Sequence, residues 1–128
     1  MSDLSHRLAS KSIFAEQEPQ ARGADGLSKT WITRGGNFAV CYSEVEPGAV
    51  LERKDNPEEY MVIIPPDGAP ATISAGGDSV AAGPDSLTIV PPGPSRIEAR
   101  AKGVIAMIVS RASQDIMELA VNAAAYAD

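Results

Sequence analysis

The chain offers few side chains for nucleophilic, redox or metal chemistry. It has one cysteine, Cys41, and one histidine, His6, which lies near the N-terminus. A single cysteine excludes an intramolecular disulfide and a cage of several thiolates. A single histidine excludes enzymes that need several imidazoles, and a Ser-His-Asp arrangement would have to recruit it from a polar end segment. We therefore interpret Cys41 as a small buried strand residue and His6 as an exposed one.

Two other kinds of residue come at spacings that could serve chemistry. Glu58 and Glu59 directly precede an apolar run, so we expect one carboxylate to face solvent and the other to face inward. Glycine pairs at 35–36 and 76–77 have the composition of phosphate loops. No plausible helix follows either pair, so we predict hairpin turns there.

Composition limits the partners. The chain has 128 residues and is 44% hydrophobic, which suits one folded domain. Lys and Arg number 11 against 17 Asp and Glu, and broad nucleic-acid contact needs the opposite balance. The longest apolar runs, near 61–66 and 104–109, are too short to cross a bilayer, and residues 1–12 lack a signal-peptide pattern. We expect a cytoplasmic protein with no nucleic-acid or membrane partner.

Gly and Pro divide the chain into short β-rich runs. Runs of this length between turn residues are typical of a β-sandwich or barrel. The predicted strands are 30–34, 37–43, 50–54, 59–64, 72–74, 86–90, 95–100 and 104–111.

The two ends differ from this pattern. Residues 1–26 have weak periodicity and are interpreted as an N-terminal arm, with a short strand around 12–15. Residues 27–112 form the β-barrel, and residues 113–128 hold a C-terminal helix of the same domain. Ser113 can cap that helix and Asp115 falls in its first turn, where a negative charge is favoured. Apolar residues at helical spacing extend the prediction over 114–125: Ile116, Leu119, Ala120 and Ala123.

Two stretches resemble the conserved blocks of the cupin superfamily. Residues 47–64 correspond to a block with a glycine, a His-x-His pair and a glutamate before a strand. Residues 83–96 correspond to a block in which a strand leads to Pro-x-Gly, two residues and a histidine, and Pro91-Pro92-Gly93 followed by Arg96 fits that spacing. The resemblance covers roughly 48–100. It implies an all-β, single-domain double-stranded β-helix, a jelly-roll-like cupin barrel, that pairs as a homodimer through strands apolar on both faces.

The metal-ligand positions of the resemblance are altered. In cupins the histidines and the glutamate converge inside the barrel on a divalent metal. Counting forward from the first-block glycine places Lys54 and Asn56 at the first two histidine positions, and counting back from Glu59 places Glu52 and Lys54 there. Both counts remain open.

The second block changes in the same direction. Arg96 stands at its histidine position, and Glu59 is the one family ligand that remains. Lys and Arg are cations without a free lone pair, so they repel a divalent ion where imidazole would bind it. The resemblance therefore predicts a cupin that has lost its metal and needs no cofactor.

If the barrel forms, Lys54, Glu59 and Arg96 point toward a shared cavity. The three charges either neutralise one another as filling or receive the anionic group of a small carboxylate-bearing or sugar-like ligand. The ligand-binding candidates are Arg96, Lys54, Glu52, Asn56, Arg100 and Met61.

Three alternatives stay open, including whether the chain is an enzyme. One is an isomerase, epimerase or lyase in which Glu59 is the catalytic base and Lys54 or Tyr60 the acid. Another is a metal-dependent dioxygenase. The last is a structural or partner-binding cupin whose cavity is filled by side chains.

Overall fold

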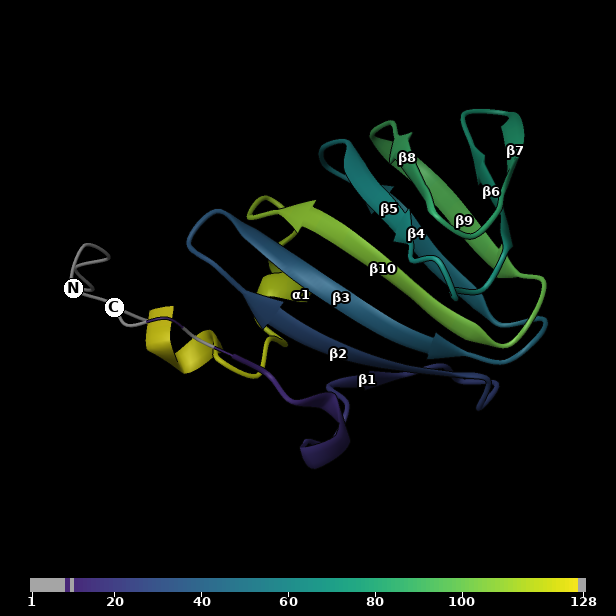
Figure 1. The fold of residues 1–128 in the computed structure, drawn as a ribbon. Helices are drawn as coiled ribbons and strands as arrows, with labels where there is room; N and C mark the ends of the chain where they lie inside the picture. The colour runs from purple at the N-terminus through teal and green to yellow at the C-terminus, as the bar shows by residue number, and fades with distance from the viewer. Residues whose placement is uncertain (1–8, 10, 127–128) are drawn as a thin grey trace.

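Two antiparallel sheets packed against each other make up the protein (Figure 1). The structure is a computed structural model that describes residues 9 and 11–126. The larger sheet has the order β1 (Ala21–Arg22), β2 (Ser28–Arg34), β3 (Phe38–Val45), β10 (Gly103–Ser110), β5 (Tyr60–Ile64) and β8 (Ser86–Val90). The smaller sheet has the order β4 (Val50–Asn56), β9 (Gly93–Ala99), β6 (Ala71–Ala75) and β7 (Asp78–Ala82). This arrangement confirms the predicted all-β, jelly-roll-like fold class.

All eight predicted strands are present, and β1 and β7 are additional. The β7 strand was missed because its residues are small and four of its five are exposed, so it lacks an apolar alternation. The turn before it agrees with the prediction: Gly76 and Gly77 have φ values of 58° and 85°. Residues with a side chain rarely adopt such angles, so the glycine pair allows the tight β6–β7 hairpin.

The N-terminal segment does not contain the strand expected around 12–15. Residues Phe14–Glu16 form a 3-10 helix instead. The ring of Phe14 stacks on Tyr42 at 4.1 Å between centroids and lies 5.8 Å from Trp31. The indole Nε1 of Trp31 donates to the Gln17 carbonyl at 2.8 Å. Packing onto the outer face of β2 and β3 therefore sets the local conformation.

The C-terminal helix is shorter than the predicted 114–125. The α-helix α1 covers Gln114–Met117, and a 3-10 helix covers Ala123–Tyr126. Between them, the Val121 amide donates to the Ile32 carbonyl, and the Asn122 amide side chain exchanges two hydrogen bonds with the Arg34 backbone. These bonds to β2 outweigh helix propensity.

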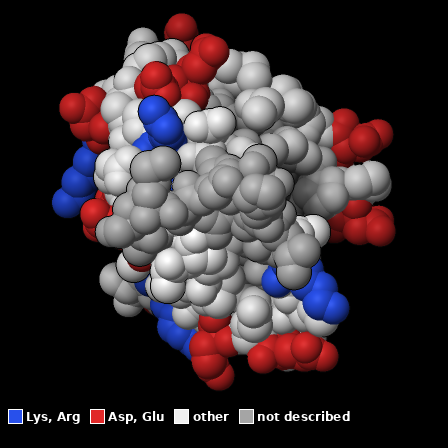
Figure 2. All heavy atoms as spheres, turned by 90° about the vertical axis from the view of Figure 1, so that its left-hand side faces the viewer, with Lys and Arg blue, Asp and Glu red and all other residues white. Residues whose placement is uncertain are grey.

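The face of the molecule that carries the C-terminal 3-10 helix has acidic and basic side chains interspersed around its rim (Figure 2). None of the helices in the described part of the chain is long and apolar enough to span a membrane.

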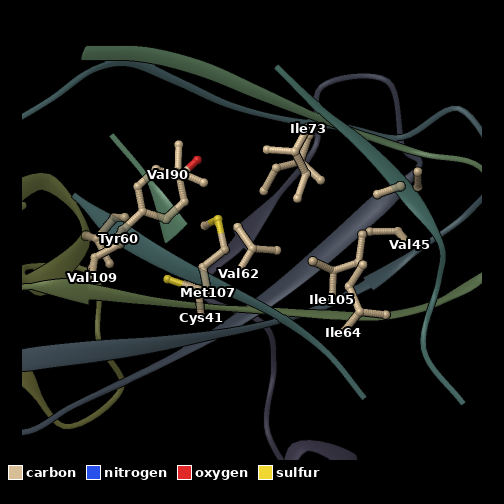
Figure 3. Packing of buried hydrophobic residues seen from close by; sticks show 14 of the residues in the cluster. Cys41, Val45, Tyr60, Val62, Ile64, Ile73, Val90, Ile105, Met107 and Val109 are labelled. Atoms are coloured by element: carbon tan, nitrogen blue, oxygen red, sulfur yellow. The ribbon is translucent and has the colours of Figure 1, made fainter. Parts of the chain in front are cut away.

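The inner faces of the two sheets form one hydrophobic core. Tyr60, Val62 and Ile105 come from the larger sheet and meet Ile73 and Ile97 from the smaller one. Figure 3 shows the side chains of this cluster filling the space between the sheets. Full burial of an aliphatic side chain stabilises a fold by about 1.5–3 kcal/mol. Apolar packing thus occupies the interior in which a cavity was expected.

The outer faces of the two sheets carry different residues. On the larger sheet, the cross-strand pairing makes two apolar rows, Val40–Ile108–Met61–Ile89 and Tyr42–Ala106–Ile63–Leu87. Leu87 and Ile89 are 56% and 52% exposed. On the smaller sheet, the pairing makes the polar row Glu52–Arg96–Ser74–Ser79.

Candidate functional site

A β-bulge in β4 determines which charged residues enter the barrel. Arg53 lies opposite Ser95 of β9, and Asn56 lies opposite Gly93. Three steps along β4 therefore match two steps along β9, so β4 contains one extra residue. The bulge places both Arg53 and Asn56 on the inner side.

Neither count of the first cupin block is fully correct. Asn56 is buried at 1% exposure, as the forward count expects, but Lys54 and Glu52 are both exposed. Arg96 is also exposed, because its neighbours Ser95 and Ile97 take the inward positions of β9. The cation that turns inward is Arg53, which was not among the predicted site residues.

Arg53 is held by a dense hydrogen-bond network at the end of the barrel. Its Nη1 and Nη2 donate to the two carboxylate oxygens of Asp115 at 2.7 and 3.0 Å, and its Nε donates to the Asn56 Oδ1 at 2.8 Å. The Ser113 hydroxyl donates to the same oxygen at 3.0 Å, which explains why it does not cap α1. The hydrogen bonds from Arg53 hold the pKa of Asp115 below its usual value. The network ties α1 to the barrel.

Tyr60 and Cys41 are buried more deeply than Arg53. The Tyr60 hydroxyl, from the larger sheet, is 2.6 Å from the Ser95 hydroxyl of the smaller sheet. Burial raises the pKa of Tyr60, and it raises the pKa of the Cys41 thiol to about 12. Cys41 is therefore a neutral buried side chain at physiological pH, in line with its interpretation from the sequence.

The residues in this region do not fit the divalent metal of the cupin pattern. The inward polar groups are Arg53, Asn56, Tyr60 and Ser95, which provide no imidazole and place a guanidinium among the donors. Within residues 9 and 11–126, no three His, Cys, Asp or Glu side chains are grouped to hold a metal ion. We assign no chemical step to a metal here.

A surface hollow of about 580 Å³ lies where the Gly76-Gly77 turn stands beside β4 and β9. Three cations and two carboxylates contribute to it, together with serines of β6, β7 and β9. The polar residues that line it are Glu52, Arg53, Lys54, Ser74, Asp78, Ser79, Ser95 and Arg96. The structure thus brings Glu52, Lys54 and Arg96 together, at the surface rather than inside the barrel.

The other predicted site residues lie elsewhere. Glu59 is exposed and lines, with Met61 and Ile89, a separate hollow of about 320 Å³ on the larger sheet. The Arg100 Nη1 lies 3.5 Å from the Glu98 Oε1. Arg100 is not among the described residues that line the 580 Å³ hollow. The expectation of one shared cavity for Lys54, Glu59 and Arg96 is therefore wrong, because the sheets direct Glu59 to a different face. His6 lies outside the described residues.

Arg53, Ser95 and Asp115 were not predicted as site residues, although Asp115 was expected in the first turn of the C-terminal helix. The one sign of the bulge in the sequence was that the two counts of the first block disagreed. An extra residue in a strand breaks the inward–outward alternation, so counts from its two ends give different inward residues. No comparable signal pairs Arg53 with Asp115, which is 62 positions away.

Comparisons with known proteins give no match to a family model and none among curated proteins. Solved structures do match. KdgF from Halomonas sp. superposes with a TM-score of 0.68 at 12% identity, covering 83% of this chain and 98% of KdgF. An RmlC-like cupin from Shewanella frigidimarina superposes with a TM-score of 0.66 at 14% identity, covering 84% of this chain and 96% of that one. A cupin superfamily protein from Desulfitobacterium hafniense superposes with a TM-score of 0.58 at 13% identity, covering 70% of this chain and 81% of that one. The chain therefore has the cupin fold.

Proposed function

We propose that the protein is a metal-independent binding protein for a small anionic ligand, carboxylate-bearing or sugar-like, held in the 580 Å³ hollow. The observation that carries the proposal is a pair of exposed cations, Lys54 and Arg96, that line the hollow in a chain with 11 cations against 17 carboxylates. The third cation of the hollow, Arg53, is already paired with Asp115. Two exposed cations in one hollow attract an anion.

The lining residues suit an acid that also carries hydroxyl groups. Lys54 has no ion-pair partner among the described residues. The Arg96 Nη2 lies 3.3 Å from the Glu98 Oε2, and an exposed ion pair of this kind contributes little to stability. Both cations are thus free to exchange partners. The hydroxyls of Ser74 and Ser79, 2.8 Å apart, can donate to and accept from ligand hydroxyls.

The alternatives have less support. An isomerase, epimerase or lyase with Glu59 as base needs Lys54 or Tyr60 as its acid. Lys54 lines a different hollow from Glu59. Tyr60 lines the same hollow as Glu59, but its side chain is buried and its hydroxyl lies 2.6 Å from the Ser95 hydroxyl between the sheets. A dioxygenase needs imidazole ligands, which the inward positions of β4 and β9 lack. A purely structural role leaves the hollow beside Arg96 unexplained.

Calorimetric titration with gluconate and sorbitol tests the proposal, because the two probes differ chiefly in the carboxylate. We expect gluconate to bind in the millimolar range or tighter and sorbitol not to bind. Arg96→Gln and Lys54→Gln should each weaken gluconate binding by about tenfold. Arg100→Gln is the matched control, an exposed cation of the same region outside the hollow. Equal binding of gluconate and sorbitol, or no binding of gluconate, overturns the proposal.

We also propose that the apolar rows of the larger sheet pair two copies of the chain. The rows carry no charge, so two acidic copies can meet there without bringing carboxylates together. A face apposed to itself about a two-fold axis buries the exposed Leu87 and Ile89 of both copies.

A further inference from the structure

The 320 Å³ hollow on the outer face of the larger sheet combines apolar side chains with one carboxylate. Its outward-facing apolar side chains come from the four neighbouring strands β3, β10, β5 and β8: Phe38, Ile108, Met61 and Ile89. Phe38 and Ile89 are 46% and 52% exposed. A concave site of about 300–1,000 Å³ that is mainly apolar, with few polar groups, is the usual form of a small-molecule pocket.

The carboxylate of this hollow is unpaired. Glu59 is exposed, and its side chain forms no ion pair or hydrogen bond with the other described residues. The adjacent Glu58 differs, because it accepts a hydrogen bond from the Ser110 hydroxyl. No lysine or arginine is among the described residues that line the hollow, whereas the 580 Å³ hollow has charges of both signs. A cation is therefore the complement of this site.

The cross-strand register places the carboxylate at one end of the apolar side chains. Ile108 pairs with Met61, so continuing the register by two residues brings Glu59 beside Ser110. On its other side, Ser110 pairs with Phe38. Two residues along a strand span about 7 Å, so a ligand whose positive group meets Glu59 needs an apolar body of about this length to cover Met61 and Ile108.

We infer that this hollow binds a small molecule that joins an apolar body to one ammonium group. The ammonium group donates to the Glu59 carboxylate, and the body covers Ile108, Met61 and Ile89. The inference goes beyond the anion site, which lies on the smaller sheet. It also bears on the proposed pairing of two copies, because both the ligand and a second copy cover Ile89 and therefore compete.

Three probes of one shape test the charge preference. The probes are 3-phenylpropylamine, 3-phenylpropanol and 3-phenylpropionate, which at neutral pH are a cation, a neutral molecule and an anion. In NMR titrations followed by the methyl resonances of Met61, Ile89 and Ile108, the amine should bind in the millimolar range. It should bind about fivefold more tightly than the alcohol, and the anion should bind most weakly. Equal binding of amine and alcohol, or methyl resonances that do not move, overturns the inference.

Substitutions separate the roles of the carboxylate and the apolar side chains. Glu59→Gln keeps the shape of the side chain and removes its charge, so it should abolish the preference for the amine over the alcohol. Glu118→Gln changes an exposed carboxylate directly after α1, and this matched control should keep the preference. Met61→Ser should weaken the binding of amine and alcohol alike, because both bodies cover that side chain. A preference for the amine that survives in Glu59→Gln contradicts the inference.

Self-association provides a second readout. If a chain binds the amine only when it is unpaired, the dissociation constant of the pair rises with the square of (1 + [amine]/Kd), about a hundredfold at ten times the Kd. Sedimentation velocity should then show the wild type moving toward monomer in the amine. Pairs that persist while the Ile89 methyl resonances report binding refute the competition. A wild type that is monomeric without the amine refutes the pairing alone, and the NMR titrations still decide the binding site.

Discussion

The two sheets of the barrel have similar inner faces and opposite outer faces. Inward, each presents buried aliphatic residues to the same core. Outward, the larger sheet carries apolar rows that end at Ile89 and Leu87, and the smaller sheet carries the row from Glu52 to Ser79. The inner alternation specifies the fold, whereas the outer faces differ in chemistry: exposed apolar side chains in one case, charged and hydroxyl side chains in the other.

The largest expected effect is a loss of stability that should be similar for the two sheets, because their inner faces share one core. Ile105→Ala in the larger sheet and Ile97→Ala in the smaller one should each lower the free energy of unfolding by about 2–5 kcal/mol, because both side chains are fully buried at 0% exposure. Urea denaturation followed by circular dichroism measures both values. A cost below about 1 kcal/mol for one of them would show that its sheet does not share the core equally.

Substitutions on the outer faces of the two sheets should differ in their effect on self-association. Ile89→Lys places a charge in the apolar row and should weaken self-association by about a hundredfold, since the lysine would be buried without a partner. Thr72→Lys, on the outer side of the smaller sheet, should leave association unchanged. Sedimentation velocity distinguishes the states, and a monomeric wild type at micromolar concentration would refute pairing through this face.

The contact between Tyr60 and Ser95 links the two sheets and provides a finer test. Tyr60→Phe should lower the free energy of unfolding by about 1–3 kcal/mol, because it leaves the buried Ser95 hydroxyl without this partner. Ser95→Ala in the same background should restore part of that loss. If the two substitutions add without coupling in urea unfolding, the hydroxyls do not interact across the sheets.

The smallest expected effect on stability comes from the ion pair between Arg53 of the smaller sheet and Asp115 of α1. Arg53 lowers the pKa of Asp115, so the ionised carboxylate stabilises the folded state. This contribution is fully present above the ordinary aspartate pKa of about 3.9 and is lost as the pH falls through the lower folded-state value. Because Asp115 is 66% exposed, we expect about 1 kcal/mol or less.

Unfolding of the wild type and Asp115→Asn at several pH values measures this contribution. The difference between them should be constant above pH about 4 and shrink below it. A difference that grows on acidification would contradict the assignment.

Much of the fold follows from local signals. The strand Ser86–Val90 has the predicted bounds because Gly83-Pro84-Asp85 and Pro91-Pro92 end the pairing on both sides. The C-terminal helix was predicted too long because the bonds that end it come from Ile32 and Arg34, far away in the sequence.

The site was less predictable than the fold. The sequence indicated that cations had replaced the metal-binding histidines, and cations do line the hollow. It could not show which residue after Arg53 turns inward, because the extra residue of β4 falls between Arg53 and Asn56. Whether two charged groups meet across the barrel, as Arg53 and Asp115 do, depends on the docking of α1 rather than on neighbouring residues.

The extra residue in β4 also has an evolutionary consequence. Regular pairing beyond Arg53 would place Asp55, rather than Asn56, opposite Gly93, whereas loss of one codon at 54 or 55 would remove the bulge and keep Asn56 there. A deletion at these two positions can therefore be accepted without changing which side chains face this end of the barrel.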